Sequence, residues 1–241
     1  MHLHRRATDL YIYAPPELAE IISLQLKVSG TVLNYKIHFK ILEPEKESAC
    51  ILDNEVVSVK TIPLIHRVPC YGFLFREKPK PRRIIKEKIR KEFTMSNMLS
   101  LKKGEHIKDK KGNILFKNED YTLAPRKSRS YAYCTDTLYH EPVIDIIKGV
   151  DLLYHEATFL NEKLNRATET FHTTAKQAAT IAKKAKVGQL IIGHFSSRYR
   201  DITPFKNEAR QVFENTILAI EGESTYIDDW KIKPGWINNQ N

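Results

Sequence analysis

Short apolar runs alternate with amphipathic stretches along this chain. In the first part, four runs are expected to form strands, at 9–13, 37–42, 55–62 and 71–75. A helix is expected between the first two, because Pro15-Pro16 suits a first helical turn. Its apolar residues recur at helical spacing before Gly30: Leu18, Ile21, Ile22 and Leu26.

From residue 130 onward, strands and helices alternate, which favours a layered α/β architecture. The predicted strands lie at 130–134, 151–154, 189–193 and 216–220, with a last one near 224–227. The predicted helices lie near 142–148, 173–186 and 204–214. The helix after His172 is expected to be capped by Thr173 or Thr174. It presents small residues for close packing, at Ala175, Ala178, Ala179 and Ala182.

Ionisable residues follow three of these apolar runs. Asp136 comes after 130–134, His155-Glu156 after 152–154, and His194 after 190–192. Polar side chains at the ends of buried strands are where an α/β fold collects its chemistry. An aspartate, a histidine-glutamate pair and a histidine at one edge predict a metal-dependent hydrolytic site.

Between the two halves, residues 76–92 hold nine basic and three acidic side chains. Pro79 and Pro81 favour an extended entry, 84–91 suits a short helix, and 110–113 suits a hairpin turn. Few of these residues could face a core, so the region is expected to project. The net charge of +10 indicates an anionic partner, while the 41% hydrophobic share supports a core elsewhere.

Other sequence signals exclude several protein classes. No apolar run approaches the roughly 18–20 residues of a membrane span. The first residues lack the apolar core of a signal peptide, so an intracellular protein is expected. Cys50, Cys70 and Cys134 are widely spaced, so neither a zinc ribbon nor a disulfide framework is indicated.

The motifs resemble the ribonuclease Z family, tRNA 3′-end endonucleases of the metallo-β-lactamase superfamily. Four are shared, in order: Asp-Thr at 136–137, His-Glu-Ala-Thr at 155–158, His-Thr-Thr at 172–174, and His-x-Ser-x-Arg-Tyr at 194–199. Each is weak alone, but the set is specific. The stretch 62–73, which contains His66, extends the resemblance over nearly the whole chain.

The resemblance implies an αββα sandwich with its N-terminal part missing, and a zinc site at one edge of the sheets. His66, Asp136 and His194 match the family's metal-ligand positions, with Asp136 as the bridging carboxylate. The intact family domain holds two Zn²⁺ ions per subunit. The family also implies a homodimer and a cytoplasmic protein.

Four further residues are expected to serve catalysis or phosphate binding, and the resemblance implies this role for the first of them, His172. His172 is expected to stabilise the phosphate or to donate a proton to the leaving oxygen. Glu156 either orients His172 or braces its own loop, and His155 is expected to pack in the core. Ser196 and Arg198 suit phosphate oxygens, although Arg198 could instead pair with a neighbouring acid.

The basic region occupies the place of the family's tRNA-binding exosite, so residues 76–125 are expected to be an inserted tRNA-binding arm within one domain. Contacts between the arm and the phosphates of the tRNA would bind the tRNA without recognising its sequence. The predicted phosphate contacts are Lys80, Arg82, Arg83, Lys86, Lys88, Arg90 and Lys91.

One family motif has no counterpart. The first metal motif of the superfamily is His-x-His-x-Asp-His, but His2-Leu3-His4 is followed by two arginines and is not expected to bind metal. The chain is therefore expected to begin inside the domain. The leading hypothesis is a zinc-dependent endoribonuclease that removes the 3′ trailer from precursor tRNA. The alternatives are a catalytically inactive tRNA-binding homologue and a small-ester metallo-hydrolase of the same fold.

Overall fold

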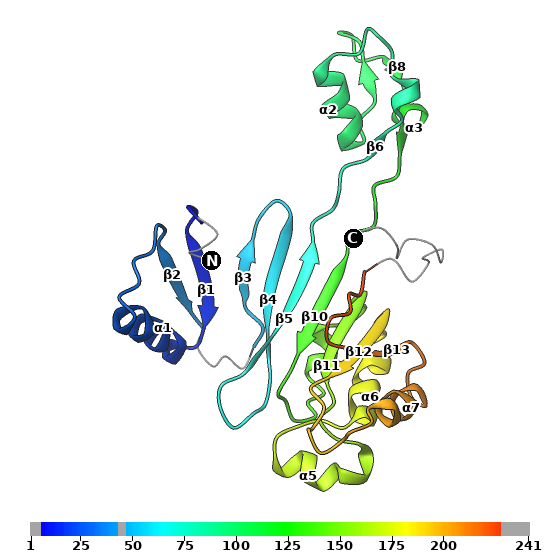
Figure 1. Cartoon of the computed structure of the whole chain (residues 1–241). Helices are drawn as coiled ribbons and strands as arrows, with labels where there is room; N and C mark the ends of the chain where they lie inside the picture. The colour runs from blue at the N-terminus through cyan, green and yellow to red at the C-terminus, as the bar shows by residue number, and fades with distance from the viewer. Residues whose placement is uncertain (1–5, 43–46, 228–241) are drawn as a thin grey trace.

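The computed structural model describes residues 6–42 and 47–227. A seven-stranded sheet forms its centre, in the order β13-β12-β11-β10-β5-β4-β3 (Figure 1). β10, β11, β12 and β13 run parallel, whereas β10, β5, β4 and β3 pair antiparallel. The strand bounds are β3 Cys50–Asp53, β4 Val57–Pro63, β5 Tyr71–Glu77, β10 Ser130–Cys134, β11 Leu152–Glu156, β12 Gln189–Gly193 and β13 Thr216–Leu218.

The core lies between this sheet and the helices on one face. The helices of this core are α4 Val143–Ile146, α6 Ala175–Ala185 and α7 Thr203–Arg210. The 3-10 turn η3 (Asn161–Lys163) leads into α5 (Leu164–Glu169), which lies beyond the ends of the strands (Figure 1). The predicted small-residue face of α6 is fully buried in the core against β11 and β12. Thr174, rather than Thr173, caps α6 through a capping box with Gln177.

A separate βαβ unit precedes the large sheet. β1 (Leu10–Ala14) pairs in parallel with β2 (Ile37–Ile41), and α1 (Pro16–Val28) connects them. Both strands and the helix agree with the sequence prediction. No residue of α1 is buried, however, and Ile21 is 60% exposed, so its predicted apolar stripe covers only a two-stranded sheet.

Residues 78–127, which we call the arm, stand apart from the sheet at the ends of β5 and β10 (Figure 1). The arm holds β6 (Arg83–Ile84), η2 (Lys86–Lys88), α2 (Met95–Lys103), β7 (Ile107–Lys108), β8 (Ile114–Phe116), α3 (Asn118–Tyr121) and β9 (Thr122–Leu123). The arm also has its own small core, of Leu101, Ile107 and Tyr121, which lies outside the basic stretch 76–92. The hairpin turn at 110–113 is confirmed.

Several predicted elements differ from the structure. The helix expected at 84–91 is only the single turn η2. The last strand expected near 224–227 is absent from the described residues, where Thr225 and Ile227 instead line a cavity of about 370 Å³ against Tyr131 and Tyr154 of the sheet. β3, α2 and α5 were not predicted, and His2 and His4 lie outside the described residues.

Candidate metal centre

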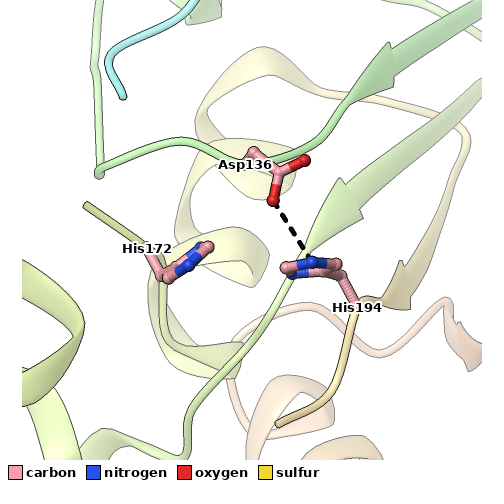
Figure 2. A group of neighbouring side chains, drawn as sticks. All are labelled: Asp136, His172 and His194. Atoms are coloured by element: carbon pink, nitrogen blue, oxygen red, sulfur yellow. Dashed lines mark ion pairs between the residues drawn. The ribbon is translucent and has the colours of Figure 1, made fainter. Parts of the chain in front are cut away.

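Parallel strands bring Asp136 and His194 to the same edge of the sheet. Asp136 follows β10 and His194 follows β12, with β11 between them. His172 reaches this edge from the turn between α5 and α6. One ligand atom from each of the three residues lies within 4.8 Å of the others (Figure 2).

The three side chains converge on one point. His194 Nε2 lies 3.2 Å from Asp136 Oδ1, and the rings of His172 and His194 have centroids 5.3 Å apart. The Asp136 and His194 side chains are 37% and 43% exposed, so a substrate could reach them. Figure 2 shows the two imidazoles facing the carboxylate from different segments of the chain.

His66 lies beside this group, on the loop between β4 and β5. Its ring centroid is 5.2 Å from that of His172, and its Nδ1 is 3.2 Å from the carbonyl oxygen of Phe171. The sequence named His66, Asp136 and His194 as ligands and His172 as a catalytic residue. The structure instead groups His172 with Asp136 and His194, with His66 as its neighbour.

Buried Glu156 organises the floor of the site. Its carboxylate accepts five hydrogen bonds, from the backbone N–H groups of Thr137, Thr158 and Thr173, the Thr158 hydroxyl and His172 Nδ1. The bond from His172 is 2.8 Å long. Glu156 therefore does both things left open by the sequence: it orients His172 and it braces its own loop.

The Glu156–His172 contact changes the pKa of both groups. Burial, the largest single effect, acts to raise the pKa of the Glu156 carboxyl. The hydrogen bond from His172 and its charge, together with smaller contributions from His155 and the Thr158 hydroxyl, outweigh burial and hold the pKa below its usual value. The same hydrogen bond raises the pKa of His172 against the opposing effect of burial. His172 consequently keeps a proton to higher pH than an ordinary histidine.

The backbone is strained at this site. Asp136, Phe171 and His194 have φ values of 47°, 59° and 60°, in the left-handed region that residues with a Cβ rarely adopt. Each such residue costs of order 1–3 kcal/mol and persists only where its surroundings enforce it. Among the described residues, Lys186 is the one other non-glycine with positive φ. The strain thus gathers where the polar side chains converge.

The residue before His194 must be small. A Cβ on Gly193 would lie 2.5 Å from the Tyr154 hydroxyl oxygen.

His155 points into the core, fully buried, and its Nδ1 lies 2.7 Å from the Glu156 carbonyl oxygen. This placement agrees with the packing role expected for His155.

Ser196 and Arg198 lie on the loop that follows His194. The Ser196 N–H donates to the Thr158 carbonyl over 3.1 Å, which fixes the loop to the strand-end segment after β11. The Arg198 guanidinium sits over the Phe159 ring at 5.2 Å and is exposed. Within the described ranges, no carboxylate forms an ion pair with Arg198, so its charge is available to an anion.

The donor set fits a divalent zinc ion. Zinc favours imidazole nitrogen and carboxylate oxygen, and a ligating histidine usually donates its second ring N–H to an acceptor. His66, His172 and His194 each have Nδ1 beside an oxygen, of Phe171, Glu156 and Thr158 respectively. This arrangement leaves the three Nε2 atoms for a metal or a substrate.

The arm carries the charge of the molecule. Residues 78–127 hold 16 basic and 6 acidic side chains, a net charge of +10, and the rest of the chain holds 23 of each sign. Among the predicted contacts, Arg83, Lys86, Lys88, Arg90 and Lys91 are exposed. Lys80 instead pairs with Glu77, and Arg82 donates to the Thr122 hydroxyl. Further exposed cations, which the sequence reasoning left out, include Lys102, Lys103, Lys110 and Lys111.

Comparison with known proteins identifies the family. No family model matches the chain. It is 48% identical over 229 residues to ribonuclease Z of Cytophaga hutchinsonii, a span of 95% of this chain and 73% of that protein. The chain belongs to the ribonuclease Z family.

Solved structures agree on the fold of this ribonuclease Z homologue. The short form of human tRNase Z matches with a TM-score of 0.57 at 20% identity, covering 90% of this chain and 66% of that one. A metallo-β-lactamase fold protein from Bacillus subtilis matches with a TM-score of 0.52 at 19% identity, covering 88% and 62%. The chain thus has the α/β metallo-β-lactamase fold, as the sequence indicated. Among the described residues, no helix is both long and apolar enough to cross a membrane.

Proposed function

We propose that this ribonuclease Z homologue is a zinc-dependent endoribonuclease that removes the 3′ trailer from precursor tRNA. The observation that supports this most directly is the convergence of Asp136, His172 and His194 within 4.8 Å, on a family member whose net charge lies entirely in one projecting arm. Cleavage would leave a 3′-hydroxyl on the tRNA. The protein would act in the cytoplasm, as a homodimer.

In this proposal Asp136, His194 and His66 hold zinc. A bound zinc ion supplies a Lewis acid that polarises the phosphodiester and lowers the pKa of water. His172, held by Glu156 through Nδ1, keeps a proton on Nε2 and donates it to the leaving oxygen. Ser196 and Arg198 bind the non-bridging phosphate oxygens.

The arm is proposed to be an insertion in a single domain that binds the tRNA backbone. A surface with a net charge of +10 over 50 residues attracts phosphates without reading sequence. Its cations lie on a small folded unit, because Leu101, Ile107 and Tyr121 pack together and Arg90 lies over the Phe116 ring at 5.0 Å. The basic surface therefore has a defined shape.

Asp136→Ala tests the metal assignment. We expect the variant to lose bound zinc in elemental analysis and to lose cleavage of a precursor tRNA by at least about 10³-fold, because the carboxylate is an anionic ligand at the centre of the group. Asp145→Ala, which removes an exposed carboxylate on α4, is the matched control and should retain both.

The outcomes of this test separate the other readings. Full zinc occupancy in Asp136→Ala would contradict the ligand assignment. Tight tRNA binding by the unmutated chain without zinc and without cleavage would instead identify a tRNA-binding homologue. Hydrolysis of small esters with no activity on precursor tRNA would identify a small-molecule hydrolase.

A further inference from the structure

A groove lies on the arm between α2 and the segment that contains β6 and η2 (Figure 1). Its volume is about 540 Å³, and its lining residues are Ile84, Lys86, Ile89, Met98 and Lys102. Met98 and Lys102 lie one turn apart on α2, and the other three residues come from β6, η2 and the residue after η2. Two segments of the arm therefore form the two walls of this groove.

Hydrogen bonds hold the two walls together. The Arg82 N–H donates to the Lys102 carbonyl over 2.9 Å, which joins the entry to β6 to the end of α2. The Ile85 N–H donates to the Tyr121 carbonyl over 2.9 Å, and the Ile89 side chain packs against the small core of the arm. The groove is thus part of the folded arm and has a defined shape.

The lining of the groove combines aliphatic surface with positive charge. Ile84, Ile89 and Met98 are half-buried, whereas Lys86 and Lys102 are exposed. None of the residues that line the groove is acidic. In the part of the chain that the structure describes, neither lysine forms an ion pair. The groove therefore presents an apolar floor between two available cations.

We propose that this groove binds an unpaired nucleobase of the RNA, with Lys86 and Lys102 against the neighbouring phosphates. The inference rests on the proposed function, and it adds a base contact to an arm otherwise assigned only to phosphates. An unstacked nucleotide presents the apolar face of its base beside a phosphate, which is the combination that this lining matches. The volume of the groove lies within the range of small-ligand sites, about 300–1,000 Å³, so a base and its ribose fit.

An acidic amphipathic peptide would also match an aliphatic groove with two lysines. The charge of the whole arm favours RNA over such a peptide. A polyanion can use cations spread over all 50 residues of the arm, whereas a peptide seated in the groove would use two of the 16 basic side chains.

Binding of two polyanions to the full chain separates base contact from charge. One is a single-stranded oligoadenylate, and the other is an inorganic polyphosphate of the same total charge, which has no bases. A chelator in the buffer prevents cleavage. We expect Met98→Ala to weaken oligoadenylate binding about fivefold, near the lower end for loss of a base-stacking side chain, and to change polyphosphate binding by less than about twofold.

Three further variants control this measurement. Met95→Ala is the matched control, because Met95 lies on the same helix, is 77% exposed and does not line the groove, so both affinities should stay at the wild-type value. Met98→Phe keeps an apolar contact and should retain oligoadenylate binding. Lys102→Gln removes a charge and should weaken both polyanions by the same factor.

Equal loss of both polyanions in Met98→Ala, or loss of neither, would refute the base contact. Binding of an acidic amphipathic peptide that depends on Met98 and is tighter than that of oligoadenylate would overturn it in favour of a protein partner. Cleavage of precursor tRNA is a separate readout. A wild-type chain that binds oligoadenylate through Met98 and cleaves no precursor tRNA would contradict the proposed function and leave the base contact supported.

Discussion

The residues at the candidate metal centre combine backbone strain with dense hydrogen bonding. Asp136 and His194 adopt left-handed φ values, and the Glu156 carboxylate accepts five hydrogen bonds beneath them. Strain of this kind needs compensation elsewhere, and the buried carboxylate supplies it by tying three separate loops together. The site therefore combines a buried, fully hydrogen-bonded carboxylate at Glu156 with solvent-exposed side chains at Asp136 and His194.

His172 is expected to act on the substrate. His172→Ala should lower turnover on precursor tRNA by about 10²–10⁴-fold, because it removes a positioned proton donor, and zinc should remain bound. Steady-state kinetics and elemental analysis on the same preparation provide the measurement. A variant that also loses its zinc would show that His172 is a ligand, as its place in the group of three permits.

Lys186 offers a way to measure strain away from the site. It ends α6 with a φ of 53°, a conformation that suits glycine. Lys186→Gly should raise the free energy of unfolding by about 0.5–1 kcal/mol in urea titrations. Lys183→Gly, inside the last turn of α6, should lower it by about 1 kcal/mol. If Lys186→Gly lowers the free energy of unfolding as Lys183→Gly does, the left-handed conformation of Lys186 does not destabilise the protein.

The positions of some site residues could be predicted from the sequence, and those of others could not. Asp136 and His194 follow buried strands and Glu156 is the last residue of one, so their place at one edge depends only on strand order. The position of His172 relative to His66 depends on two loops and on the φ of Phe171, which no hydrophobic pattern encodes. Thr158 carried no signal of its own beyond its place in the His-Glu-Ala-Thr motif.

At the scale of elements, the long strands of the central sheet were predictable, whereas short strands such as β3 and β8 were not. β12 was predicted with its observed bounds, since Leu190, Ile191 and Ile192 leave no alternative to a buried strand. α2 was missed because its sequence, MSNMLSLKK, buries only Leu101. The strand expected at 224–227 fails because the chain there lies against the aromatic face of the sheet instead of pairing with an edge.

Glu77 ties the arm to the sheet and should make this junction sensitive to acid. Its carboxylate binds Arg129 at 2.9 Å and Lys80 at 2.5 Å, where β5 ends and β10 is about to begin. The hydrogen bonds from Arg129 are the main cause that lowers the pKa of Glu77 to about 2. Because the folded-state pKa lies below the ordinary value of 4.5, the stabilisation is complete above that pH and is lost as the pH falls toward 2.

Glu77→Gln should therefore lower the free energy of unfolding by about 1 kcal/mol near neutral pH. The difference from the wild type should shrink below pH 4.5 as the wild-type carboxylate takes up its proton. Urea unfolding across this range measures it, with Glu87→Gln on the exposed surface of the arm as the control. A difference that stays constant with pH would assign the effect to shape and not to charge.

At the scale of the whole molecule, the net charge is concentrated in the part that projects from the sheet. The arm holds the entire net charge of +10, while the part that carries the metal centre is balanced. Changing Lys86, Lys88 and Lys91 to Glu should raise KM for precursor tRNA about tenfold or more and leave kcat nearly constant. It should also reduce the slope of log affinity against log salt by about 2–3, as expected for three lost phosphate contacts.

The control for this charge reversal is an equal change elsewhere. Lys27, Lys183 and Lys186 are exposed residues outside the arm, and changing them to Glu alters the net charge by the same amount. A similar rise in KM for both triple variants would mean that total charge, and not the arm, attracts the tRNA. The salt slope distinguishes the two, because it counts contacts.

β10 connects the arm to the candidate metal centre, and its length fixes part of the distance between them. It starts at Ser130, three residues after the end of the arm, and Asp136 follows two residues after Cys134, its last residue. Five residues of strand span about 17 Å, and a strand hydrogen-bonded on both sides does not stretch. The arm and the candidate metal centre of one chain therefore lie beyond opposite ends of β10, and a molecule that contacts both in the same chain must span at least this length.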